Sequence, residues 1–369
     1  MKLSRREFVA ASLASGLGSS SAFGQRLPAA REVPWLGEIQ RPPARLPADA
    51  PKLLPLLVDA GRNPIRTRAQ WEKHRQFLHR QWLELIGEII PRDHLAPQAR
   101  RPLQFEIRES DRNDGVVRRR IRYETERGVK TSAYLMMPYK PKRRLPAVVV
   151  LHSTVDYTIR QGAGLEGPPE AAWGLKLAQR GMVVICPRCF LWNDTPPVNY
   201  HARVKEHKRR HPLSRGIAKM LYDARRAVDL LTSLNEVDPE RIGAAGHSLG
   251  AKEALYLAAF DERIRATVSS EGGIGTKFSN WNAPWYWGDD EFFGREHHEL
   301  LALVAPRAFL LIGGESADGE RSWPFIEAVL PVYRFYGEPC RVGLYNHRQG
   351  HTIPPLAERR VYEWLETYL

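Results

Sequence analysis

The sequence is poor in cysteine, in long apolar runs and in dense clusters of one charge, and these shortages exclude several classes of protein. Three cysteines in 369 residues cannot build a disulfide framework. The apolar run from Phe8 to Leu17 is shorter than the about 20 residues that a membrane-spanning helix needs, and no later run approaches that length. The composition, 43% hydrophobic and 26% charged, excludes a collagen-like, coiled-coil or wholly disordered chain.

The net charge of +13 results from 55 lysines and arginines against 42 acidic residues. The basic residues are spread along the chain, with short clusters at Arg118–Arg120 and Lys208–Arg210, and no nucleic-acid-binding motif accompanies them. We therefore expect no nucleic-acid partner. An acidic polymer that carries the substrate stays open as an alternative.

Residues 1–24 have the order of a bacterial twin-arginine export signal. Arg5 and Arg6 precede a weakly apolar stretch, and Ala22 and Gly24 stand where a signal peptidase reads small residues. We expect cleavage near Gly24, a periplasmic or secreted protein, and no integral membrane segment after cleavage.

Residues 25–100 are expected to precede the catalytic domain as an extension. Seven prolines between Pro28 and Pro55 predict an extended strap, because proline fixes φ and lacks an N–H donor. Apolar residues then recur at helical spacing between Thr67 and Gly87, which predicts one amphipathic helix.

From residue 101 to residue 369, strand patterns alternate with helix patterns. Leading antiparallel strands are predicted at Phe105–Arg108, Val116–Glu126 and Thr131–Met137. Apolar runs predict buried parallel strands at Ala147–Leu151, Met182–Cys186, Arg241–Ala245, Ile264–Ser269, Ala308–Ile312 and Arg341–Tyr345. Helices are predicted at Ala171–Arg180, Ile217–Leu234, Ala251–Phe260, Pro324–Tyr336 and Leu356–Tyr368. This order predicts an α/β fold with a doubly wound, mostly parallel sheet.

The most specific motif is Gly246-His247-Ser248-Leu249-Gly250, which lies between a predicted strand and a predicted helix. That context is typical of the G-x-S-x-G turn, which exposes a nucleophilic serine. The motif predicts Ser248 as the nucleophile. It also predicts the amide of Leu249, at a helix N-terminus, as one donor to the oxyanion.

A serine nucleophile needs a base, and two histidines follow the last predicted strand. His351 follows a glycine and directly precedes the terminal helix, so we prefer it to His347. The second oxyanion donor is expected in the loop after Leu151, from the amide of Thr154 or else Ser153. His152 is expected to be structural.

The histidine needs an acid to fix its tautomer, and several carboxylates compete for that role. Asp318 follows the strand predicted at 308–312 and is the expected acid, and Glu315 and Glu320 in the same loop are weaker candidates. Glu271 follows the preceding strand and is the alternative acid, and its neighbours Gly272 and Gly273 would permit a tight turn. Both lie between the serine and the histidine in chain order, so the choice stays open.

This elbow, with its order of serine, acid and histidine, resembles the α/β-hydrolase superfamily, and more narrowly its dienelactone-hydrolase-like and acetyl-xylan-esterase-like branch. The segments that carry the resemblance are Leu151–Thr154, Ala178–Val184, Asp223–Leu231, Val237–Gly243, Ala258–Ile264 and Ala305–Ala308. The resemblance covers about Arg101 to Leu369 and implies hydrolysis of an ester, thioester, amide or lactone. Relatives commonly have glycine or another residue at the Glu271 position. The carboxylate here departs from that pattern, so the identity of the catalytic acid stays open.

Aromatic residues crowd the insertion after Glu271, and Trp281, Trp285 and Trp287 are the candidate substrate-binding residues. Their rings could stack on a sugar or an aryl acyl group, or they could form a hydrophobic cluster that fixes the loops. Neither a metal site nor a cofactor is indicated, because the histidines at 201–211 have no cysteine or carboxylate framework at ligand spacing.

These observations together predict an exported serine hydrolase that cleaves a carboxylic ester, such as an acetyl ester of a carbohydrate, through an acyl-enzyme. Its partner would be a small-molecule or carbohydrate ester. A prolyl-oligopeptidase-type peptidase and a non-catalytic hydrolase-fold binding protein are the alternatives. The sequence leaves open the acyl group, the alcohol, the oligomeric state and whether Cys186 and Cys189 pair.

Overall fold

The computed structural model describes residues 31–89, 103–193, 198–288 and 294–369. Residues Glu32–Leu369 form one compact unit, so the proline-rich segment from residue 32 onward and the first long helix are part of the same body as the predicted catalytic domain. The predicted export signal lies outside the described residues. In the part of the chain that is described, no helix is long and apolar enough to span a membrane.

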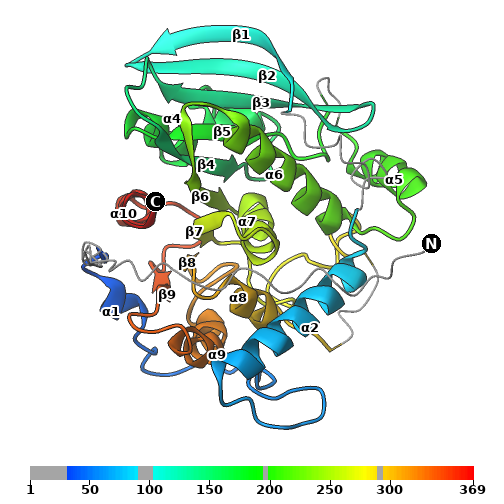
Figure 1. The fold of residues 1–369 in the computed structure, drawn as a ribbon, viewed down its shortest axis with the longest axis vertical. Helices are drawn as coiled ribbons and strands as arrows, with labels where there is room; N and C mark the ends of the chain where they lie inside the picture. The colour runs from blue at the N-terminus through cyan, green and yellow to red at the C-terminus, as the bar shows by residue number, and fades with distance from the viewer. Residues whose placement is uncertain (1–30, 90–102, 194–197, 289–293) are drawn as a thin grey trace, which may run out of the picture. The chain divides into compact units, whose positions relative to one another are not determined.

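A nine-stranded sheet forms the centre of this unit, in the order β1-β2-β3-β5-β4-β6-β7-β8-β9 (Figure 1). The antiparallel end consists of β1 (Phe105–Asn113), β2 (Val116–Glu126) and β3 (Val129–Pro138), and β3 runs antiparallel to β5 (Val183–Pro187). The parallel strands that complete the sheet are β4 (Leu145–Leu151), β6 (Val237–His247), β7 (Ile264–Ser270), β8 (Ala308–Gly313) and β9 (Val342–Asn346). The predicted fold class is confirmed.

Helices cover both faces of the sheet, because the parallel strands are apolar on both sides. One face is covered by α2 (Arg68–Ile86), α6 (Gly216–Ser233), α7 (Leu249–Phe260), α8 (His298–Val304) and α9 (Trp323–Arg334). The other face is covered by α1 (Leu36–Ile39), α3 (Ile159–Gly162), α4 (Trp173–Gln179) and α10 (Pro355–Tyr368). Short 3₁₀ turns lie at η3 (Pro169–Ala171) and η4 (Glu320–Ser322).

The predicted N-terminal helix, α2, packs into the core on one face of the sheet. It begins at a capping box, in which the Thr67 side chain accepts from the Gln70 amide, and it ends at Gly87 with a φ of 69°. Trp71 and Trp82 are both fully buried in the core. The Trp82 indole donates to the Glu299 carboxylate on α8 at 2.7 Å, which ties the extension to the catalytic body.

The histidines between residues 201 and 211 belong to a helix that the sequence pattern did not indicate, α5 (Tyr200–Arg210). Its sequence is almost wholly polar, so it shows little apolar periodicity from which a helix could be predicted. The Asn199 side chain caps its first turn by accepting from the Ala202 amide at 2.9 Å.

Candidate active site

Ser248 lies on a tight turn between β6 and α7. Its φ of 59° and ψ of −117° are a conformation that residues other than glycine rarely adopt. A Cβ on Gly246 would lie 2.2 Å from the backbone of Gly250, and one on Gly250 would lie 2.1 Å from the Leu151 carbonyl oxygen. The Ser248 N–H donates to the Ser270 carbonyl at 2.8 Å. Both flanking glycines are therefore required, and the turn is fixed to the neighbouring strand.

His351 lies beside this turn. Its ring centroid is 4.7 Å from that of His247, the residue that precedes Ser248. Burial lowers the pKa of His247 to about 3, so the ring that packs against His351 is neutral. The His351 side chain is 43% exposed, which leaves it open to a substrate and to water.

The competing histidine, His347, is buried, and its main chain helps to fix the loop that carries His351. Its N–H donates to the Gly313 carbonyl at 2.8 Å, and the Gly350 N–H donates to the Gly314 carbonyl at 2.7 Å. These two bonds hold the loop after β9 against the loop after β8. The His347 ring adds a third bond within the loop, because its Nδ1 accepts from the Gln349 amide at 3.1 Å.

The carboxylate beside His351 belongs to Glu271. Its Oε2 lies 3.1 Å from Nδ1 of His351. Glu271 directly follows β7, has a φ of 53°, and donates its N–H to the Ile312 carbonyl at 2.9 Å. The expected acid, Asp318, does not lie beside the histidine, and the carboxylate that does is that of the alternative acid, Glu271.

The Glu271 carboxylate is held by backbone amides of the loop after β8. Oε1 accepts from the amides of Gly314 and Asp318, and Oε2 accepts from Ala317 at 2.8 Å. Burial raises the pKa of Glu271, but the hydrogen bonds from His351 and from the amides of Ala317 and Gly314 outweigh it, so the pKa lies below its ordinary value. The group is ionised at neutral pH and favours the histidine tautomer with its proton on Nδ1.

The Asp318 carboxylate binds the backbone of the segment that follows Glu271. Its Oδ2 accepts from the Gly273 amide at 2.7 Å, and its Oδ1 accepts from the Ile274 amide at 2.7 Å and from the Ser322 hydroxyl at 2.9 Å. Asp318 is fully buried. Because both of its oxygens accept from this segment, Asp318 supports the loop that carries the acid and does not orient the histidine.

A buried lysine, which no sequence motif indicated, also holds this segment. Lys252 Nζ donates to the Gly272 carbonyl at 2.6 Å and lies 4.1 Å from the ring centre of Trp281. The Trp281 indole donates to the Gly273 carbonyl at 2.7 Å. Burial lowers the pKa of Lys252 to about 7, against the attraction of Asp318. A lysine within the otherwise apolar start of α7 was the signal that could have revealed it.

The structure does not support two of the three predicted substrate-binding tryptophans. Trp281 is fully buried and Trp287 is 2% exposed, so both belong to the core. Trp285 is partly exposed and packs edge-on against Tyr200, with 5.5 Å between ring centroids. Trp281 and Trp287 instead fit the alternative interpretation, a hydrophobic cluster that fixes the loops.

The two predicted oxyanion donors lie in different surroundings. Leu249 is the first residue of α7, where the N–H groups point out of the helix. In the loop after β4, the Ser153 amide donates to the Gln161 side chain at 2.9 Å. This bond occupies Ser153, so the geometry favours the exposed Thr154 over Ser153 as the second donor.

His152 ties the loop after β4 to the segment after β5, in agreement with the structural role expected for it. Its Nε2 accepts from the Cys189 amide at 3.1 Å, so its Nδ1 carries the proton and donates to the Ser153 carbonyl at 2.7 Å. Burial lowers its pKa to about 4, which keeps the ring neutral. Cys186 and Cys189 are both free, buried thiols.

Part of the chain is similar in sequence to known proteins. Residues 131–282 match the dienelactone hydrolase family. This segment contains Ser248, Leu249, Thr154 and Glu271, whereas His351 lies beyond it. YtaP of Bacillus subtilis (strain 168), which is named as a hydrolase, is 28% identical over 246 residues, which are 64% of this chain and 79% of YtaP.

Two solved structures show how far the likeness of fold extends. The glucuronoyl esterase from Solibacter usitatus superposes with a TM-score of 0.64 at 17% identity, over 88% of this chain and 100% of that chain. The acetyl xylan esterase from Paenibacillus sp. R4 superposes with a TM-score of 0.53 at 16% identity, over 80% of this chain and 93% of that chain. At these identities the likeness is one of fold.

Proposed function

We propose that this chain, which has the α/β-hydrolase fold and a segment that matches the dienelactone hydrolase family, hydrolyses carboxylic esters of carbohydrates through Ser248, His351 and Glu271. The observation that carries the proposal is the contact between His351 Nδ1 and the buried Glu271 carboxylate, next to the strained turn of Ser248. The fold shared with glucuronoyl and acetyl xylan esterases supports a carbohydrate ester as the substrate.

In this mechanism His351 Nε2 takes the Ser248 hydroxyl proton while Oγ attacks the ester carbonyl carbon. The amides of Leu249 and Thr154 bind the oxyanion of the tetrahedral intermediate. The intermediate collapses, the ester C–O bond breaks, and His351 returns the proton to the departing alcohol. Water, activated by the same nitrogen, then cleaves the acyl-enzyme. Throughout, the ionised Glu271 balances the positive charge that forms on His351.

The direct test replaces the nucleophile and compares the two histidines. Ser248→Ala should lower kcat on an activated acetyl ester by several orders of magnitude and abolish labelling by a fluorophosphonate probe, because the covalent route is lost. His351→Gln should do the same to kcat, whereas the matched variant His347→Gln should keep most of the activity. A Ser248→Ala enzyme that retains more than about a tenth of the activity would exclude this mechanism.

Two assays distinguish this proposal from the alternatives, a peptidase and a non-catalytic binding protein. A panel of acetyl esters and peptide amides distinguishes an esterase from a peptidase, and labelling of Ser248 by the fluorophosphonate distinguishes either enzyme from a binding protein. We also propose export to the periplasm or beyond, on the basis of the paired Arg5 and Arg6 ahead of the apolar stretch.

A further inference from the structure

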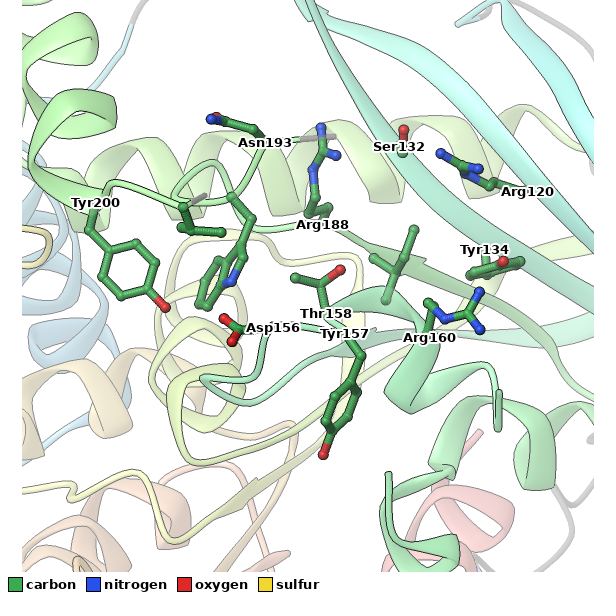
Figure 2. Close-up of a pocket in the computed structure, with 13 residues that line it drawn as sticks. Arg120, Ser132, Tyr134, Asp156, Tyr157, Thr158, Arg160, Arg188, Asn193 and Tyr200 are labelled. Carbon is green, nitrogen blue, oxygen red and sulfur yellow. The ribbon is translucent and has the colours of Figure 1, made fainter. Parts of the chain in front are cut away.

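A pocket of about 720 Å³ opens at the edge of the sheet where the parallel strands end (Figure 2). This volume lies within the range of small-molecule sites. Its position follows from the strand register, because Arg120 on β2 pairs with Tyr134 on β3, and Tyr134 pairs with Cys186 near the carboxyl end of β5. The antiparallel strands thus extend the wall of the active-site edge, and the loops after β4 and β5 complete the pocket.

The pocket and the proposed oxyanion loop share one segment of chain. Gln161, which holds the Ser153 amide, directly follows Arg160, which lines the pocket. The strand order places β5 and β3 two and three spacings from β6, the strand that directly precedes Ser248. With about 4.8 Å between neighbouring strands, the pocket walls lie about 10 to 14 Å from the nucleophile's strand.

Three arginines line this pocket, and two of them form ion pairs with neighbouring carboxylates. Arg188 follows β5 and is 9% exposed. Arg120 pairs with Glu109 at 2.7 Å and Arg160 pairs with Glu166 at 2.5 Å, with the two arginine side chains 36% and 48% exposed. Each of these surface pairs uses one guanidinium nitrogen of the arginine, and a guanidinium has five N–H donors. Both arginines therefore keep donors for a second acceptor.

The opposite end of the pocket is aromatic and acidic. Figure 2 shows Arg120, Tyr134 and Arg160 gathered at one end, and Asp156 and Tyr200 toward the other. Aromatic faces suit a sugar ring, and a carboxylate such as Asp156 accepts from sugar hydroxyls. The planar guanidinium fork matches a carboxylate. Asp156 would repel a second negative charge, which disfavours a doubly charged phosphate.

We infer that this pocket binds a sugar unit that bears a free carboxylate, next to the ester that Ser248 attacks. The inference rests on the proposed function and narrows its substrate to esters on acidic carbohydrates. Arg120, Arg160 and Arg188 bind the carboxylate, and the aromatic end receives the ring. The excess of basic over acidic residues in the chain favours such a polymer as well.

The test compares two esters that differ at one group. Mono-O-acetylated methyl glucuronoside carries a carboxylate where mono-O-acetylated methyl glucoside carries a hydroxymethyl group. Wild-type enzyme should release acetate from the acidic ester with a kcat/KM about tenfold higher or more, as expected for charge-assisted hydrogen bonds. The double variant Arg120→Gln/Arg160→Gln should reduce this ratio to about one, mainly by lowering kcat/KM for the acidic ester. Both side chains are partly exposed, so the fold should persist.

The matched control is Arg265→Gln, which removes one arginine charge from the exposed start of β7, at the opposite edge of the sheet. It should keep the wild-type ratio. If this control reduces the ratio as the double variant does, the preference comes from the overall charge and the pocket is not its source. Equal kcat/KM values for the two esters in wild-type enzyme would also overturn the inference.

Binding to the Ser248→Ala variant, measured by calorimetry, separates this inference from the proposed function. The acidic ester should bind more tightly than the neutral one. If it does so while wild-type enzyme releases no acetate, the pocket assignment stands and the proposed hydrolysis fails. If acetate is released but the two esters bind equally, the hydrolysis stands and the pocket assignment fails. Equally tight binding of a 6-sulfated methyl glucoside would overturn the carboxylate as the recognised group.

Discussion

Exchanging the two rival carboxylates for their amides gives the sharpest test of the proposed triad. In Glu271→Gln, one end of the new amide must face His351. Oε1 now accepts two backbone amides, whereas Oε2 accepts one amide and the histidine. The carbonyl should therefore stay at the Oε1 position, and the NH₂ group should point at His351 Nδ1. A donor there forces the histidine proton onto Nε2, the nitrogen that must accept from Ser248.

The expected loss in kcat is about 10⁴-fold, as found when the acid of a serine-protease triad is replaced by its amide. At 1.36 kcal/mol for each factor of ten, this corresponds to about 5 kcal/mol of activation free energy. Asp318→Asn should behave differently. It keeps an acceptor for Ile274 and Ser322 but places a donor against the Gly273 amide, so it should cost about 1–3 kcal/mol of unfolding free energy and far less activity.

The assay is steady-state hydrolysis of one activated acetyl ester, with urea unfolding of each variant. Glu320→Gln is the control, since Glu320 lies on the same loop and pairs with Arg348 at the surface, where ion pairs contribute about 0–1 kcal/mol. It should leave kcat unchanged. A large kcat loss in Asp318→Asn together with a mild effect in Glu271→Gln would refute the reasoning and assign Asp318 as the acid.

Three further changes test export and the buried charges. Replacing Arg5 and Arg6 with lysine should retain the precursor in the cytoplasm, and unchanged export in cell fractionation would refute the twin-arginine signal. Lys219→Met should lower the unfolding free energy by about 3–5 kcal/mol in urea, because Lys219 is 1% exposed and pairs with Glu126 at 2.6 Å and with a second buried carboxylate. Burial raises the pKa of Glu253 to about 8 from 4.5. The native state thus binds more protons than the unfolded state between these values, and its stability falls as the pH rises through them. Glu253→Gln should remove this loss, so that its Tm exceeds that of the wild type at pH 9 by more than at pH 6.

The features that the sequence predicted correctly depend on neighbours in the chain. The turn at Ser248 is specified by Gly246 and Gly250 on either side of it, and the buried parallel strands are apolar runs bounded by turns. The predicted ends of strands and helices differ from the observed ones by a few residues, because strands such as β6 continue through polar positions once a partner strand supplies hydrogen bonds.

The choice of acid could not be made from the sequence, because both candidates satisfy the chain order. It depends on the left-handed backbone at Glu271 and on amide donors 43 to 47 residues farther along the chain. The tryptophans pose a similar problem. An aromatic-rich insertion has the same pattern whether its rings face a substrate or the core, and only packing against buried groups such as Lys252 places Trp281 inside.

The wide spacing of the proposed catalytic groups along the chain has a consequence for the order of folding. One strand–helix–strand unit, β6-α7-β7, carries both Ser248 and Glu271, so it can form from local contacts. The contact between Glu271 and His351, however, joins residues 80 positions apart and requires β9 to pair with β8. Such long-range pairings form slowly. Recovery of esterase activity during refolding would therefore report the docking of the last strand, and a ribosome-bound chain that ends before β9 would hold a nucleophile without its base.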